Sequence, residues 1–143
     1  MHHIIYQSTE TRRLSDEELR QLLQQWRAAN QRWGITGMLL YSEGQFLQII
    51  EGEEAAVRSL FDNIARSYYH VHVDKLADGP IQQRCFSAWS MGFVPLQPEA
   101  FSRVLGYLNP QNSAELAAYA HGCDDELAAL LHSFVHEQQE GLW

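Results

Sequence analysis

Two amphipathic helices separated by a β-hairpin limit this sequence to few folds. Ser15 and Glu18 form a capping box that starts the first helix, and Gly34 ends it. The first apolar stripe comprises Leu19, Leu22, Leu23 and Trp26, and the second comprises Val57, Leu60, Phe61, Ile64 and Tyr68. Between the helices, two strand-like runs flank the turn Ser42-Glu43-Gly44. Because each helix must bury its stripe, both are expected to pack on one sheet.

Alternating or apolar runs predict five strands around these helices. They cover residues 2–8, 36–41, 45–50, 70–76 and 84–93. Asp78-Gly79-Pro80 is expected to be a turn, and His2 and His3 an exposed strand end. The order β-α-β-β-α-β-β predicts an α+β fold, a ferredoxin-like sheet with two helices on one face.

The pattern becomes helical after residue 95. Apolar spacing predicts one helix around Phe101 to Leu108 and a second over residues 113–138. These roughly 45 residues are too few for an independent domain and too apolar for a free tail. We therefore expect a domain over residues 1–95 and a C-terminal helical extension over residues 96–143, which packs on the sheet or on a partner subunit.

Composition excludes several classes of partner. The net charge is −8 with only ten Lys and Arg, so neither nucleic acid nor an anionic membrane is an expected partner. Cys85 and Cys123 lack metal-ligand spacing, and no third ligand accompanies His132 and His136, so no metal is expected. No segment reads as an export signal or a membrane span, which predicts a cytoplasmic protein.

Two carboxamides stand where apolar side chains are expected. Asn30 continues the stripe of the first helix, and Gln48 shares a strand face with Phe46 and Ile50. An unpaired buried amide costs about 1–3 kcal/mol, so these two need a polar ligand or a closed network. Together with Tyr6 they provide no ordinary nucleophile or general base, but they suit the rim of a planar heterocycle such as isoalloxazine.

The sequence resembles BLUF domains, the family that senses blue light using flavin. The resemblance rests on Ile4–Ser8, Asn30, Gly34-Ile-Thr-Gly37, Phe46–Gly52, His70 and Trp89–Phe93. It implies non-covalently bound FAD, with FMN or riboflavin possible. The chain departs from the family at Ser67-Tyr68-Tyr69, where Asp-x-Arg is common, and at Ala29, where an amide is frequent. Arg27, Arg32 and Arg66 are the candidates to pair with a flavin phosphate.

The resemblance also implies roles for individual residues. The tyrosine matching Tyr6 donates an electron and a proton to photoexcited flavin, and the glutamine matching Gln48 rearranges its hydrogen bonds. The asparagine matching Asn30 holds the flavin carbonyl edge, and residues matching Trp89 and Met91 pass the change outward. Ser8, Ile64 and His70 complete the expected cofactor-binding set.

The expected function is a short, stand-alone blue-light photoreceptor. Such a flavoprotein is a signal-transduction switch and not an enzyme, and it acts through a separate output protein, commonly as a homo-oligomer. An alternative is a BLUF-like protein-interaction module that has lost flavin binding. A small acylphosphatase-like hydrolase is disfavoured because residues 7–13 contain no glycine for a phosphate-cradling loop.

Overall fold

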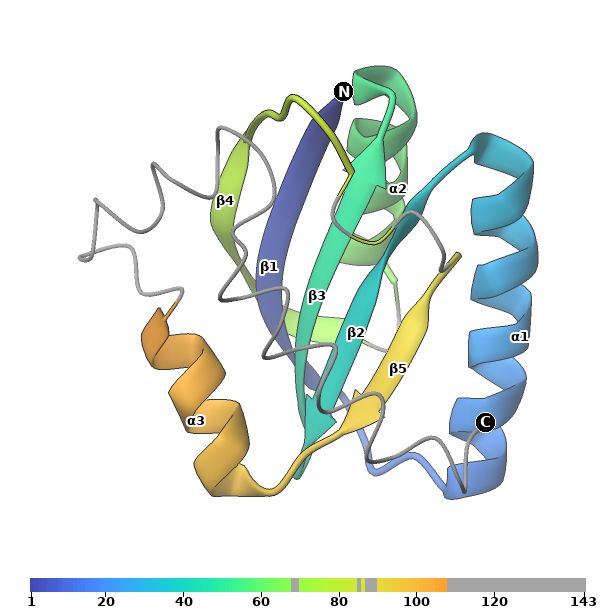
Figure 1. The fold of residues 1–143 in the computed structure, drawn as a ribbon. Coiled ribbons are helices and arrows are strands. Elements are labelled where there is room, and N and C mark those ends of the chain that lie inside the picture. Colours follow the sequence, from blue (N-terminus) through green and yellow to red (C-terminus); the bar gives the residue numbers. More distant parts are fainter. Residues whose placement is uncertain (68–69, 85, 87–89, 108–143) are drawn as a thin grey trace.

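The computed structural model describes residues 1–67, 70–84, 86 and 90–107. Its elements are β1 (His2–Glu10), α1 (Asp16–Trp33), β2 (Thr36–Ser42), β3 (Gln45–Gly52), α2 (Glu54–Ala65), β4 (His70–Pro80), β5 (Gly92–Pro95) and α3 (Pro98–Tyr107). The predicted β-α-β-β-α-β-β order is confirmed (Figure 1).

The five strands form one sheet in the order β4-β1-β3-β2-β5. The first three neighbouring pairs are antiparallel, whereas β5 runs parallel to β2. Strand β3 lies between β1 and β2, and β1 lies between β3 and β4. Both β1-α1-β2 and β3-α2-β4 are therefore split βαβ units. The predicted ferredoxin-like α+β fold is therefore confirmed, with β5 added at the β2 edge.

Local signals fix the ends of α1 and the hairpin. The Ser15 Oγ accepts a hydrogen bond from the Glu18 N–H at 3.1 Å, and Gly34 ends the helix with φ +68°. In the hairpin, Glu43 and Gly44 both have positive φ, 47° and 83°. This pair of angles is what a two-residue type I′ connection between twisted strands requires.

Two strand predictions were wrong. Asp78-Gly79-Pro80 is not a turn, because these residues continue β4 and pair with His2, His3 and Ile4 of β1. The fifth strand begins at Gly92 and not at Arg84. At residues 86, 90 and 91, which precede it, backbone groups bind side chains of other elements.

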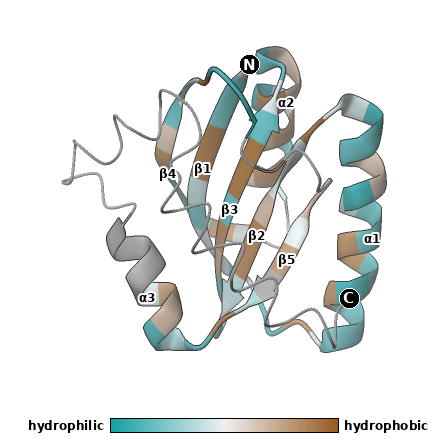
Figure 2. Ribbon diagram, in the orientation of Figure 1, coloured by the Kyte–Doolittle hydropathy of each residue, from teal (hydrophilic) through white to brown (hydrophobic). Residues whose placement is uncertain are grey.

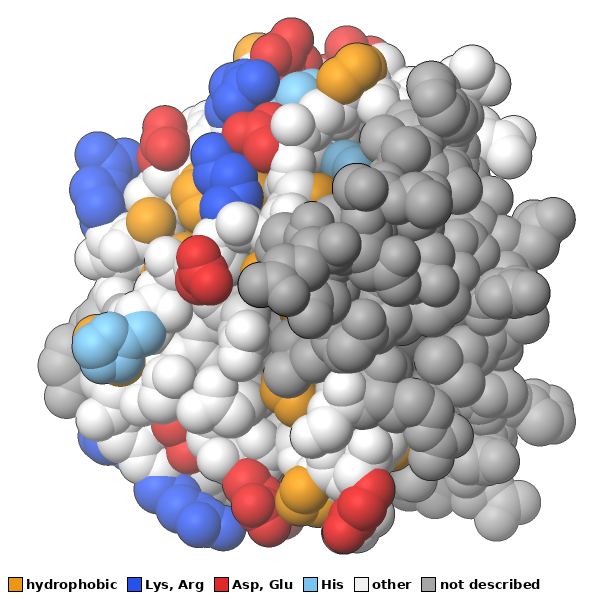
Figure 3. All heavy atoms as spheres, turned by 90° about the vertical axis from the view of Figure 1, so that its left-hand side faces the viewer, with side chains coloured by type: hydrophobic (Ala, Val, Ile, Leu, Met, Phe, Trp, Pro, Cys, Tyr) orange, Lys and Arg blue, Asp and Glu red, His pale blue; other side chains and the backbone are white. Residues whose placement is uncertain are grey.

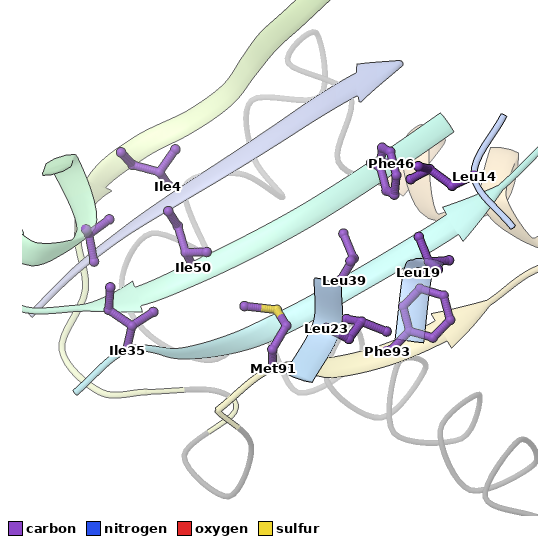
Figure 4. Packing of buried hydrophobic residues seen from close by; sticks show 11 residues of the cluster. Ile4, Leu14, Leu19, Leu23, Ile35, Leu39, Phe46, Ile50, Met91 and Phe93 are labelled. Atoms are coloured by element: carbon purple, nitrogen blue, oxygen red, sulfur yellow. The ribbon is translucent and has the colours of Figure 1, made fainter. Parts of the chain in front are cut away.

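The core that concerns the site lies between the sheet and the helices α1 and α2. Hydrophobic residues concentrate on the central strands (Figure 2). Buried side chains of this cluster include Leu19 and Leu23 of α1, Val57 of α2, and Ile4, Leu39, Phe46 and Ile50 of the sheet. Met91 lies on the same side of the sheet, near Leu23, Ile35 and Leu39 (Figure 4).

The opposite face of the sheet is also buried. Its apolar residues are Ile5, Met38, Leu40, Leu47 and Ile49. The helix α3 contacts β2, and its Phe101 is buried, which agrees with the predicted helix around that residue. The helix expected over residues 113–138 lies outside the described residues, and the domain boundary at residue 95 stays a prediction.

His2 and His3 are buried, so the expectation that they form an exposed strand end was wrong. The reason is that β1 is a central strand, paired with β3 on one side and β4 on the other. The His2 Nε2 lies 2.5 Å from the Asp78 Oδ1, and Lys75 and Arg58 also contact this carboxylate. Acidic and basic side chains gather on this side of the molecule (Figure 3).

The burial of His3 predicts a loss of stability in mild acid. Burial, followed by the neighbouring His2, lowers the pKa of His3 from 6.5 to about 4, although Asp78 opposes the change. As the pH falls through this window, the unfolded chain binds the proton before the folded chain does. We expect the free energy of unfolding to decrease by about 3 kcal/mol between pH 7 and pH 4, measured by urea unfolding.

Two variants test this assignment. His3→Gln should flatten the dependence of unfolding free energy on pH, whatever its effect at pH 7. His72→Gln, at an exposed position on β4, should retain the wild-type dependence. An unchanged pH dependence in His3→Gln would contradict the role given to His3.

Candidate functional site

Tyr6 and Gln48 form the centre of the candidate site. They occupy directly paired positions on β1 and β3, and the Tyr6 hydroxyl donates a hydrogen bond to the Gln48 Oε1. Tyr6 is completely buried and has an edge contact with Phe61, with ring centroids 5.6 Å apart. Burial raises the pKa of Tyr6 above its ordinary value. The phenol therefore stays protonated and acts as the donor in this bond.

The other end of the Gln48 carboxamide contacts Met91. The Gln48 Nε2 donates to the Met91 Sδ at 3.2 Å, and both side chains are buried. A thioether sulfur is only a weak acceptor and never a donor. One amide thus joins a phenol on β1 to a thioether beside β5. Because the sulfur can only accept, the amide nitrogen must face Met91, and the amide oxygen then accepts from Tyr6.

Two side chains of α1 hold the backbone next to Met91. The Asn30 Nδ2 donates to the Ser90 carbonyl, and the Arg27 Nε donates to the Met91 carbonyl, both at 2.8 Å. Arg27 was a candidate phosphate ligand, but here its Nε–H is used within the protein. These bonds keep Met91 beside Gln48 although residues 90 and 91 precede the strand β5.

A buried carboxylate holds the same segment on the opposite face of the sheet. Glu51 is 0% exposed, and its Oε1 accepts bonds from the Phe86 N–H at 2.7 Å and the Thr36 hydroxyl at 2.9 Å. Arg84 donates to the Thr36 Oγ1 at 2.8 Å. Strand β3 therefore binds residues that precede β5 on both faces of the sheet. Glu51 binds the Phe86 backbone on one face, and Gln48 binds the Met91 side chain on the other.

A cavity of about 180 Å³ lies between α1, α2 and the sheet beside these groups. Its lining residues are Trp26, Asn30, Leu39, Gln48, Leu60, Asn63, Ile64 and Ser67. Asn30 is 2% exposed, and among the described residues no donor reaches its side-chain oxygen. A mostly apolar cavity with a buried amide oxygen to which no described residue donates suits a flat heterocycle that carries N–H and C=O groups on its rim.

The structure brings most of the predicted site residues together. Asn30, Gln48 and Ile64 line the cavity, and Tyr6 and Met91 contact Gln48. Ser8 is buried on β1 opposite Phe46, outside the cavity lining. His70 is described only as the first residue of β4, and Trp89 lies outside the described residues.

Several residues of this site were not predicted from the sequence. Trp26 and Leu60 were assigned to apolar stripes without a ligand-binding role, Ser67 was noted only as a departure from the family pattern, and Asn63 was not assigned at all. Asn63 follows Leu60 at the i, i+3 spacing that places two residues on one helix face. Its position on the inner side of α2 could therefore have been predicted from the helical period. Nothing in the sequence indicated that Glu51 would bind the Phe86 backbone.

Two further observations concern the described residues alone. They contain no group of three or more side chains that could bind a metal ion, and His132 and His136 lie outside them. Within the same part of the chain, no helix is long and apolar enough to cross a membrane.

Comparison with known families and proteins gives consistent matches. The family model "BLUF: Sensors of blue-light using FAD" matches residues 1–92. Photoactivated adenylate cyclase subunit alpha-like protein FB of Euglena gracilis is 33% identical over 84 residues, which are 59% of this chain and 8% of that protein. Photoactivated adenylate cyclase subunit beta of Euglena longa is 33% identical over 89 residues, 62% of this chain and 10% of that protein. This chain thus spans about a tenth of the length of these curated relatives.

Solved structures give the same result over more of the chain. "BlrB - a BLUF protein, dark state structure" has a TM-score of 0.64 and 32% identity, and the match covers 80% of this chain and 90% of that one. "BlsA photo-activated state" has a TM-score of 0.70 and 25% identity, with 94% of both chains covered. "BlsA ground state" has a TM-score of 0.66 and 28% identity, with 77% of both chains covered.

The bond between Tyr6 and Gln48 predicts non-additive stabilities. Tyr6→Phe should lower the free energy of unfolding by about 1–3 kcal/mol, because the buried Gln48 oxygen loses its donor. Combined with Gln48→Leu, the loss should be smaller than the sum of the single losses by at least about 1 kcal/mol. Urea unfolding of the four proteins of this cycle measures the difference.

Gln45→Leu provides the matched control. Gln45 lies on β3 outside the cavity lining, so its effect should add to that of Tyr6→Phe within about 0.5 kcal/mol. Additive losses for Tyr6→Phe and Gln48→Leu would show that their hydrogen bond contributes no coupling.

Proposed function

The chain belongs to the BLUF family of sensors of blue light using FAD, and from this premise we propose that the cavity between α1 and α2 holds the ring of a flavin. The observation that carries the proposal is the buried series Tyr6–Gln48–Met91, whose central amide lines the cavity. Relatives and solved structures of the same family support it.

The lining residues fit the parts of a flavin ring. Asn30 and Gln48 would bind its polar rim, since a carboxamide offers both a donor and an acceptor in one plane. Leu60 and Ile64 of α2 and Trp26 of α1 would cover its faces with apolar surface. FAD is the proposed cofactor because the family description names it, with FMN or riboflavin as alternatives.

Tyr6 is the proposed electron and proton donor. A flavin, when bound and excited by blue light, supplies an oxidant strong enough to take an electron from a phenol. The raised pKa of Tyr6 keeps the phenol protonated in the dark. A phenol that loses an electron becomes a strong acid, so Tyr6 would give its electron to the flavin and pass its proton, through the Gln48 amide that accepts its hydrogen bond, to the same flavin.

Gln48 is the proposed switch. Its amide now presents oxygen to Tyr6 and nitrogen to Met91. The opposite orientation would present oxygen to a thioether, which has no proton to donate. Reorientation of Gln48 would therefore break its bond to Met91, and the change at the cavity would reach the backbone before β5. Light would shift the populations of two hydrogen-bond patterns of similar energy.

We further propose that this chain is a switch and not an enzyme. Tyr6, Asn30 and Gln48 offer no ordinary nucleophile or general base. The curated relatives are named as photoactivated adenylate cyclase subunits or proteins similar to them. This chain matches only about a tenth of their length. The signal would pass to a separate output protein. We also propose that this chain forms homo-oligomers.

Absorption spectroscopy separates this proposal from its alternative, a BLUF-like interaction module without flavin. The purified protein, supplied with FAD, FMN or riboflavin, should retain the flavin and absorb near ~450 nm. Blue light should then shift this band slightly to the red, and the shift should reverse in the dark. A protein that stays colourless with all three flavins would favour the interaction module.

Substitution of Gln48 tests the switch itself. Gln48→Leu should keep the flavin band, because Asn30 and the apolar lining remain, but it should abolish the reversible red shift. Gln45→Leu on the same strand should behave like the wild type. An intact shift in Gln48→Leu would refute the switching role.

A further inference from the structure

A second groove opens beside the ring cavity, and we infer that it binds the adenine of FAD with Trp33 as the stacking surface. The inference rests on the proposed flavin site and extends it to the choice among flavins. The groove lies between the end of α1 and the start of α2.

The groove is adjacent to the ring cavity. Asn30, Leu60 and Asn63 line both spaces. The cavity beside Gln48 measures about 180 Å³, whereas the groove measures about 540 Å³, within the range of small-molecule sites. A flavin dinucleotide is much larger than its ring, so a ligand held at Asn30 by its ring has room in the groove for its remaining half.

Small side chains form much of the groove wall. Ala29 on α1 and Ala55, Ala56 and Ser59 on α2 all line it. Because these residues carry few atoms beyond Cβ, the two helices leave space between them at this end. Ala29 was noted as a lost polar contact in the sequence, and here the lack of a larger side chain widens the groove.

Trp33 supplies the aromatic surface. It is the last residue of α1, lines the groove and is 62% exposed, the highest exposure among the large hydrophobic residues of the described chain. The Arg32 guanidinium lies 5.8 Å from the centroid of its ring. An exposed indole at a groove wall can stack on a nucleobase, since every base has a π face.

Charge is expected to contribute less than stacking. Arg32 would attract the phosphates, but Glu53 lines the same groove and would repel them. Arg66 donates to Asn63 at 3.2 Å, and Arg27 donates to the Met91 carbonyl. FMN, which has a phosphate but no adenine, should therefore bind about as well as riboflavin, and FAD should bind more tightly than both.

Titration of the flavin-free 143-residue chain in the dark tests this inference. Riboflavin, FMN and FAD are added separately, and binding is followed by flavin fluorescence. FAD should bind about tenfold more tightly than riboflavin, a factor within the range measured for stacking of one base on an aromatic side chain. FMN should bind within about threefold of riboflavin.

Variants of α1 assign the effect to Trp33. Trp33→Ala should weaken FAD binding about tenfold and leave riboflavin binding within about twofold, whereas Trp33→Phe should keep most of the preference for FAD. Gln31→Ala is the matched control, because Gln31 is exposed on α1 and outside the groove lining. It should bind all three flavins like the wild type.

The possible results separate the two levels of the proposal. Equal binding of FAD and riboflavin by the wild type, or equal weakening of all three flavins by Trp33→Ala, would overturn the adenine site while leaving the ring site in place. Binding of none of the three flavins by the wild type would overturn the ring site and, with it, this inference.

Discussion

The rest of the site depends on the hydrogen bond between Tyr6 and Gln48, which requires the two side chains to lie opposite each other in the sheet. It forms because β1 and β3 pair in the register that places these two residues opposite each other on the face covered by α1 and α2. A slip of one residue would turn one of the two side chains to the other face of the sheet. The buried cluster of Ile4, Phe46 and Ile50 on the same face opposes such a slip. Hydrophobic packing therefore fixes the geometry of a polar contact.

Much of the fold and the centre of the site could be predicted because their signals are local. Ser15 and Gly34 mark the ends of α1 through backbone hydrogen bonds within a few residues. Asn30 and Gln48 were found because each interrupts an apolar pattern whose period is known, so a polar side chain in that position must face the core. The structure places both at one cavity.

Other features depend on contacts between distant parts of the chain. The alternating residues before Gly92 suggested a strand, but side chains of Glu51, Asn30 and Arg27 bind the backbone of this segment. Asp78-Gly79-Pro80 has the composition of a turn, yet pairing with β1 overrides it. Trp26 and Leu60 follow the same helical period whether they fill a core or line a cavity, so pattern alone could not assign them to the site.

The attachment of residues 90 and 91 to α1 has a mechanical consequence. Both carbonyls are held by side chains of one helix, through Asn30 and Arg27, while Met91 is held by Gln48. If the bond between Gln48 and the Met91 sulfur breaks, the Ser90 and Met91 carbonyls are still hydrogen-bonded to α1. Any displacement of this backbone must therefore either move the Asn30 and Arg27 side chains of α1 with it or break their hydrogen bonds.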